Sequence, residues 1–126
     1  MPNAQGLQLI EIINNNIKMM DYAISIQNWR DAAYFIQQVI EKCLKLVLMS
    51  QGEPDNALYT HDLSYLIIML YNKYGINVPN NIRSTAYNVS CWEAKSRYDI
   101  SFKYKVSDIR GGAKIAKEYF KLITSA

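Results

Sequence analysis

The sequence predicts an all-α fold, an up-down antiparallel bundle of four or five helices in a single domain over residues 1–126. Apolar residues recur every three or four positions through most of the chain. Gly52, Pro54, Gly75 and Pro79 fall between these stretches, and no two segments alternate as paired strands require. A chain of 126 residues, half of them hydrophobic, can also bury a core without a metal or a disulfide.

The first two helices are predicted to form an antiparallel hairpin. Residues 5–26 carry one apolar stripe, and Asn28 is placed to cap a second helix that ends at Ser50, with Asp31 completing a capping box. Each helix is expected to be about 33 Å long, and so short a connection forces the two to pack antiparallel. The stripes consist of Ile10, Ile13, Ile17, Met20 and Ile24, and of Ala33, Ile36, Ile40, Cys43, Leu44 and Val47.

Three further helices are predicted in the rest of the chain. Thr60 is the expected N-cap of the first, and Gly75 ends it. Pro79 precedes the next, which fades near Lys95, and Ser107 is expected to cap the last. The inward-facing residues are expected to be Leu63, Leu66, Ile67, Leu70 and Tyr74, then Ile82, Ala86, Val89 and Trp92, and finally Ile109, Ala113, Ala116, Phe120 and Ile123.

Two segments depart from the helical pattern. Residues 95–106 alternate like a strand but have no partner strand, so they are expected to form an ordered loop. Gly111 and Gly112 interrupt the last helix at a cost of about 1 kcal/mol each relative to alanine. The pair is consistent with close helix packing or with a phosphate near the helix start, although no phosphate-loop pattern accompanies it.

The net charge of +3 is unevenly distributed. Residues 1–94 contain six Lys or Arg and eight Asp or Glu, a net of −2, whereas residues 95–126 contain eight and three, a net of +5. This asymmetry favours an anionic partner, such as a nucleic acid, a nucleotide or an acidic protein surface. The alternative is a solvated helix face whose lysines complement the helix dipole.

Composition excludes several kinds of site. A single His and the distant pair Cys43 and Cys91 predict no metal site and no cofactor, and both thiols are expected to be reduced. No apolar run is long enough for a membrane span, and the first residues lack the basic region of a secretory signal. The expected location is therefore cytoplasmic, with no membrane partner.

Residues 28–124 resemble the HEPN domain family (higher eukaryotes and prokaryotes nucleotide-binding). The resemblance rests on the block A-x-x-x-x-Q-Q-x-x-E-K-x-L-K that begins at Ala32, followed by His61-Asp62-Leu63 at a helix entry. Arg97-Tyr98 then precede a final helix with small residues at Ala113 and Ala116. The resemblance implies a small helical bundle, commonly a homodimer, found alone or beside a minimal nucleotidyltransferase, and some relatives are metal-independent ribonucleases or toxins.

The same resemblance implies a catalytically degenerate member. Ribonucleases of the family carry an Arg followed four to six residues later by a His, and two such motifs face one another in the dimer. Here Phe102 or Lys103 occupies the His position after Arg97. Without an imidazole, the reaction loses a contribution of about 10²–10⁴-fold.

The candidate ligand-binding residues alternate cations with aromatics, a composition that binds phosphates and stacks on bases. They are Arg97, Tyr98, Lys103, Tyr104 and Lys105. In the alternative interpretation, the tyrosines pack the loop onto the bundle and the cations face water. His61, beside Asp62, is the candidate general base in a ribonuclease, or it caps or anchors the local chain.

Two further patterns concern the surface. The second helix has a polar face with the i,i+4 pairs Gln38–Lys42 and Glu41–Lys45, where Gln37 or Glu41 is a candidate for a buried hydrogen-bond network. The aromatic residues exceed what a core of this size can hide, and this excess favours a symmetric homodimer. They include Tyr59, Tyr65, Tyr71, Tyr74, Tyr87, Trp29 and Trp92.

Three functions follow from these observations. The first is a non-catalytic, dimeric binding module for a nucleotide, RNA or a nucleotidyltransferase-type partner, as part of a toxin–antitoxin or defence-type pair. The second is a divergent ribonuclease toxin that uses Arg97, His61 and a tyrosine. The third is a structural oligomerisation domain.

Overall fold

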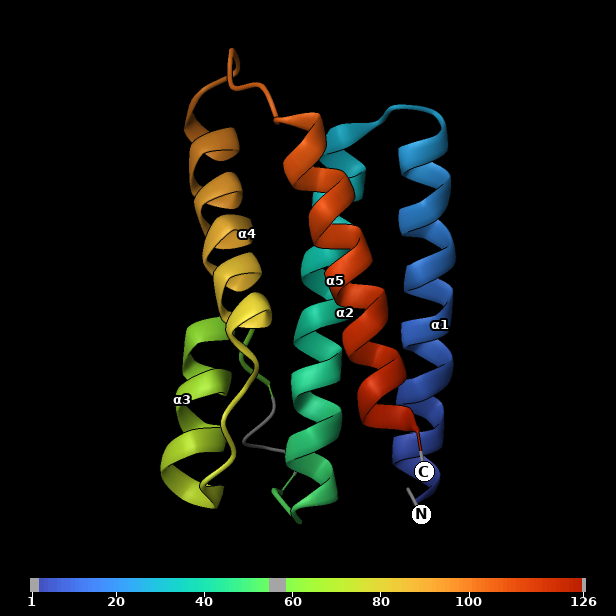
Figure 1. The fold of residues 1–126 in the computed structure, drawn as a ribbon, viewed down its shortest axis with the longest axis vertical. Helices are drawn as coiled ribbons and strands as arrows, with labels where there is room; N and C mark the ends of the chain where they lie inside the picture. Colours follow the sequence, from blue (N-terminus) through green and yellow to red (C-terminus); the bar gives the residue numbers. More distant parts are fainter. Residues whose placement is uncertain (1–2, 55–58, 126) are drawn as a thin grey trace.

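The computed structural model describes residues 3–54 and 59–125, and this part of the chain folds into five helices and no strand (Figure 1). The predicted all-α bundle is thus confirmed. The helices are α1 (Ala4–Ser25), α2 (Trp29–Ser50), α3 (Leu63–Tyr74), α4 (Asn80–Tyr98) and α5 (Val106–Thr124). Helix α2 lies at the centre and contacts the other four.

The predicted α1–α2 hairpin is confirmed, together with its cap. The Asp31 backbone N–H donates to Asn28 Oδ1 at 3.1 Å, and Asn28 Nδ2 donates back to Asp31 Oδ2 at 2.9 Å. Gln27 takes a left-handed backbone conformation with φ of 58°, which turns the chain between the helices. The apolar stripes face one another, and Ile13, Met20 and Ile36 are fully buried.

The predicted cap of α3 is wrong. Asp62, rather than Thr60, occupies the N-cap position, and Asp62 Oδ1 accepts from the Tyr65 backbone N–H at 3.2 Å. Thr60 lies two residues earlier, where its hydroxyl oxygen accepts from the Asp62 N–H. The helix begins at the buried Leu63, so Asp62 is the first residue positioned to satisfy its free N–H groups. The predicted stop at Gly75 is confirmed, with φ of 65°.

Helix α4 is longer than predicted and the following loop is shorter. The helix continues past Lys95 to Tyr98, so Arg97 and Tyr98 are helical and the loop spans only residues 99–105. An ion pair between Arg97 and Glu93, one turn apart, stabilises the extension, and a cation suits the last turn of a helix.

The predicted cap of α5 is also wrong. The helix begins at Val106, with Lys105 at the N-cap position and no side-chain cap, so Ser107 lies within the first turn. The Lys105 carbonyl accepts from the N–H groups of Asp108 and Ile109 at 3.0 and 3.1 Å. The earlier start places Ile109, which is fully buried, on the inward face.

The twin glycines of α5 have different surroundings. A Cβ on Gly112 would lie 3.5 Å from Ile36 and Thr85, so Gly112 packs where α5 approaches α2 and α4. That distance is ordinary van der Waals contact, so the approach does not require glycine. Gly111 has nothing within 4 Å of a Cβ, and it lies more than a turn inside α5 rather than at its start.

The remaining predictions concern membrane spans, metal sites and the two cysteines. Within the described ranges, no helix is long and apolar enough to cross a bilayer. The same residues contain no group of three or more His, Cys, Asp and Glu side chains placed to hold a metal ion. Cys43 and Cys91 are free thiols, and burial raises the pKa of Cys43 to about 12, so this thiol stays protonated and unreactive at neutral pH.

The aromatic residues divide between core and surface. Trp92 is buried, and Trp29 and Tyr74 are half-buried. The other aromatic residues predicted to exceed the capacity of the core are exposed, namely Tyr59, Tyr65, Tyr71 and Tyr87. Tyr65, Ile68 and Tyr71 share one exposed side of α3, so an apolar surface remains uncovered there.

Candidate functional site

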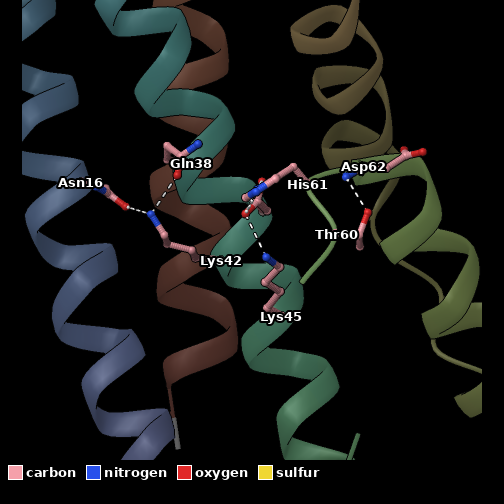
Figure 2. Close-up of polar contacts among 8 residues, drawn as sticks. Asn16, Gln38, Lys42, Lys45, Thr60, His61 and Asp62 are labelled. Atoms are coloured by element: carbon pink, nitrogen blue, oxygen red, sulfur yellow. Dashed lines mark hydrogen bonds and ion pairs between the residues drawn. The ribbon is translucent and has the colours of Figure 1, made fainter. Parts of the chain in front are cut away.

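Polar side chains gather in two places on α2. The first, here called the polar centre, contains Asn16, Gln38, Glu41, Lys42, Lys45 and His61 (Figure 2). The second, here called the basic end, lies where the start of α2, the end of α4, the 99–105 loop and the start of α5 meet (Figure 1).

Glu41 organises one half of the polar centre. Its side chain is only 2% exposed, and Oε2 accepts from Lys45 Nζ at 3.0 Å. His61 Nδ1 lies 3.2 Å from both carboxylate oxygens. A carboxylate has no proton to donate, so Nδ1 carries the hydrogen in this contact. The predicted pairing of Glu41 with Lys45 is confirmed, and of the two candidates for a buried hydrogen-bond network, Gln37 and Glu41, it is Glu41 that belongs to one.

Lys42 organises the other half. Lys42 Nζ donates to Gln38 Oε1 at 2.9 Å, which confirms the predicted i,i+4 pair, and to Asn16 Oδ1 of α1 at 2.7 Å. Burial is the main cause that lowers the pKa of Lys42, and Glu41 opposes it. These bonds join α1 to α2 through partly buried polar side chains.

His61 is bound to α2 rather than to its neighbour in the sequence. Asp62 caps α3, and its carboxylate points away from the His61 ring (Figure 2). The ring is 78% exposed, and its bond to Glu41 fastens the segment before α3 to the middle of α2. Of the two roles considered for His61, general base or anchor of the local chain, this arrangement matches the anchor.

The basic end contains all five of the candidate ligand-binding residues. Arg97 and Tyr98 lie in the last turn of α4, where Tyr98 is 83% exposed. Lys103 and Lys105 are exposed on the loop and form no ion pair with any residue that the structure describes.

Tyr104 differs from the other four because it packs the loop onto the bundle. It is half-buried, and its ring meets Trp92 edge-on with centroids 6.2 Å apart and Phe102 with centroids 4.9 Å apart. Tyr104 thus matches the packing alternative, whereas Tyr98 and the cations remain exposed to solvent.

A cavity of 160 Å³ opens beside these residues, between the first turns of α2 and the last turns of α4. Its apolar lining comes from Ala33, Val89 and Trp92, which are buried. Tyr34 and Tyr104 add aromatic rings from α2 and from the loop. The lining of the cavity therefore includes three aromatic side chains, Tyr34, Trp92 and Tyr104.

The polar lining of this cavity comes from Arg30, Gln37, Glu93 and Ser96. Ser96 donates to the Glu93 backbone carbonyl at 3.3 Å, and Glu93 Oε1 accepts from Arg97. Arg30 and Gln37 form no hydrogen bond or ion pair with another described residue. They are free to bind a ligand.

Sequence reasoning missed Arg30, Glu93 and Ser96 as site residues and assigned Gln37 to the polar face. A signal was present, because Arg30, Tyr34 and Gln37 follow one helix face at i, i+4 and i+7. Only the antiparallel pairing of α2 with α4 shows that this face meets Glu93 and Ser96. Arg110 of α5 adds another cation to the basic end, over the Trp29 ring at 5.5 Å.

A family model of the HEPN domain matches residues 8–125, nearly the whole chain. The chain belongs to the HEPN domain family. The match extends the resemblance seen over residues 28–124 to most of α1. Neither the curated proteins nor the solved structures gave a match to this chain.

In this HEPN domain, His61 and Arg97 lie in different parts of the bundle. His61 is bonded to Glu41 in the middle of α2. Arg97 is paired with Glu93, which lines the same cavity as Arg30 at the start of α2. Glu41 and Arg30 are separated by about 16 Å along α2, at 1.5 Å per residue. Phe102, one residue at the expected His position, is half-buried against Tyr104.

Proposed function

We propose that this HEPN domain is a non-catalytic binding module for RNA or a nucleotide, and that the basic end is its binding surface. One observation carries the proposal: exposed cations without partners lie beside an exposed tyrosine and a cavity that contains further unpaired polar groups. Cations bind phosphates, and exposed aromatic rings stack on unpaired bases.

The separation of His61 from Arg97 supports binding rather than cleavage. General acid–base catalysis requires the proton-transferring group within hydrogen-bond reach of the reacting atoms. Here the imidazole is three turns along α2 from the basic end and is bound to Glu41. Phosphates bound by Arg97 and Lys103 would therefore lie far from this chain's own imidazole.

The experiment compares two charge reversals, each of one Arg and one Lys, at different places on the surface. Arg97→Glu combined with Lys103→Glu is expected to lower the affinity for a short single-stranded RNA by about tenfold or more, measured by fluorescence anisotropy. The slope of log affinity against log salt is expected to fall by about 1.4, because each phosphate contact contributes about 0.7 on single strands.

Lys18→Glu combined with Arg83→Glu is the matched control, since both cations are exposed and lie outside the basic end. This control is expected to retain nearly the wild-type affinity. Equal losses in the two double variants would show non-specific attraction and overturn the assignment of the basic end, as would unchanged binding in Arg97→Glu with Lys103→Glu.

The ribonuclease alternative has a direct test. We expect RNA incubated with the purified domain in the presence of a chelator to remain intact. Cleavage that disappears in His61→Ala would instead establish an enzyme. Such cleavage would require His61 and Arg97 to reach the same phosphodiester, and within one protomer they are too far apart to do so.

We further propose that the domain forms a homodimer through the exposed side of α3, where Tyr65, Ile68 and Tyr71 lie together. Ile68→Lys is expected to convert the dimer to a monomer in sedimentation experiments. Met19→Lys, on the exposed side of α1, is the matched control and should leave the dimer intact. The opposite result would place the interface on α1.

We also propose that the domain binds a protein partner of nucleotidyltransferase type, as part of a toxin–antitoxin or defence-type pair. It is supported by family membership rather than by a particular contact. Co-expression of the domain with the nucleotidyltransferase encoded nearest to it tests this part. A complex that survives purification is the expected result, and its absence would overturn it.

A further inference from the structure

The cavity at the basic end contains hydrogen-bonding groups whose capacity is not used by the protein. Glu93 Oε1 accepts from Arg97, whereas Oε2 has no partner in the described part of the chain. The Gln37 amide and the Arg30 guanidinium, on the facing helix, are likewise without partners there. A ligand in this cavity therefore meets a carboxylate acceptor from α4 and two sets of N–H donors from α2.

We propose that this cavity binds a guanine base, and that Glu93 recognises its Watson–Crick edge. The inference rests on the proposed function, because it names the base that the RNA or nucleotide would place there. The cavity holds a single base rather than a longer segment, given its volume of 160 Å³. Its aromatic lining from Trp92, Tyr34 and Tyr104 suits a planar ring.

The chemistry of the four bases selects guanine. A carboxylate only accepts hydrogen bonds, and it has about four lone-pair sites, of which Arg97 uses one on Oε1, so Glu93 can accept from two more donors. Guanine alone has two adjacent donors, the N1–H and the 2-amino group, on its Watson–Crick edge. Adenine and cytosine place an acceptor nitrogen beside their amino group, so a carboxylate meets repulsion there. Uracil has a single N–H between two carbonyl oxygens.

The α2 side of the cavity complements the rest of the guanine edge. Guanine O6 and N7 are acceptors, and arginine is the side chain that most commonly binds them. Arg30 supplies that group from the first turn of α2, and the Gln37 amide lies two turns further along the same face. Both donors line the same cavity as Glu93.

Arg97 has a positioning role in this proposal. Its ion pair with Glu93 holds the carboxylate at the cavity while leaving Oε2 available. The guanidinium is itself exposed, so it lies where the phosphate attached to a bound guanosine can reach it. One carboxylate thus connects the base-binding cavity to the cations that bind the backbone.

The test uses oligouridine with one central nucleotide changed to guanosine, inosine, adenosine or cytidine, and measures each affinity by fluorescence anisotropy. The guanosine oligomer is expected to bind about tenfold more tightly than the adenosine oligomer. Inosine lacks the 2-amino group and is expected to fall between them. In Glu93→Gln, the amide matches adenine better than guanine, so the preference should move from guanosine toward adenosine.

Asp108→Asn is the matched control, because it removes the same charge from an exposed residue at the same end of the bundle and should keep the guanosine preference. Equal affinity for all oligomers, or a guanosine preference that survives Glu93→Gln, would overturn the guanine assignment and leave the proposed function standing. Wild-type protein that binds none of the oligomers would overturn the proposed function itself.

Discussion

In the polar centre, Glu41 is buried and bonded to Lys45 and His61, whereas at the basic end Arg30 and Gln37 line a cavity with no partner among the described residues. Both regions include polar side chains of α2. A buried polar group is costly unless it is bonded, so the polar centre can be stable only as a complete network. At the basic end, Arg30 is exposed and Gln37 is half-buried at the edge of a cavity, so their unbonded polar groups can reach water or a ligand.

The largest expected difference between the two regions is in the free energy of unfolding. Glu41→Ala leaves Lys45 and His61 without their acceptor and opens a space in the core, so we expect a loss of about 2 kcal/mol in urea denaturation. Arg30→Ala at the basic end should change stability by less than about 0.5 kcal/mol. Similar losses in both variants would contradict the assignment of different roles.

A smaller effect is expected at the turn that starts α2, directly beside the basic end. Asn28→Ala removes the N-cap bond to the Asp31 N–H and should cost about 1 kcal/mol in the same assay. Ser25→Ala, which removes an exposed bond from a serine hydroxyl to the Tyr22 carbonyl, is the control and should be nearly neutral. A neutral Asn28→Ala would show that packing alone fixes this helix start.

A gain in stability is expected within α5. Gly111→Ala should stabilise the protein by about 0.5–1 kcal/mol, because a Cβ there meets nothing within 4 Å and alanine favours a helix. Gly75→Ala should do the opposite, since Gly75 has a φ of 65°. RNA affinity should not change in Gly111→Ala; a loss would mean that this glycine belongs to the binding surface.

The smallest expected effect depends on pH and concerns another fully bonded carboxylate. Glu53 accepts from Lys73 Nζ at 2.8 Å and from the Tyr74 hydroxyl, and these bonds lower its pKa below the ordinary 4.5. A lowered folded-state pKa contributes stability above pH 4.5 that is lost as the pH falls through the folded-state value. Melting temperatures of wild type and Glu53→Gln should therefore differ at pH 7 and converge in acid. A constant difference would contradict this.

The sequence predicted the helices well because their determinants are local. Apolar spacing gave all five helices, and Asn28, Asp31 and Gly75 ended or began helices as expected. Thr60 failed as the predicted cap of α3 because Asp62, directly before the buried Leu63, bonds a free N–H of the helix start instead. Ser107 failed because α5 begins at Val106, before Ser107, and has no side-chain cap.

The candidate site was less predictable because it depends on contacts between helices. The cluster after Lys95 was visible from its charge, yet Tyr104 turned out to pack on Trp92 while Tyr98 stayed exposed. Glu93 and Arg30 are distant in the sequence and meet at one cavity only because α4 runs antiparallel to α2. The residue pattern within a single helix does not predict which residues of two different helices will lie close together.

The position of Trp92 makes the basic end observable by spectroscopy. Its indole is buried, lines the cavity and touches the Tyr104 ring, whereas Trp29, the other tryptophan, lies under Arg110. A Trp29→Phe variant thus carries a single tryptophan, whose emission reports on what enters the cavity. Occupancy of this site can be followed in real time without labelling either the protein or the RNA.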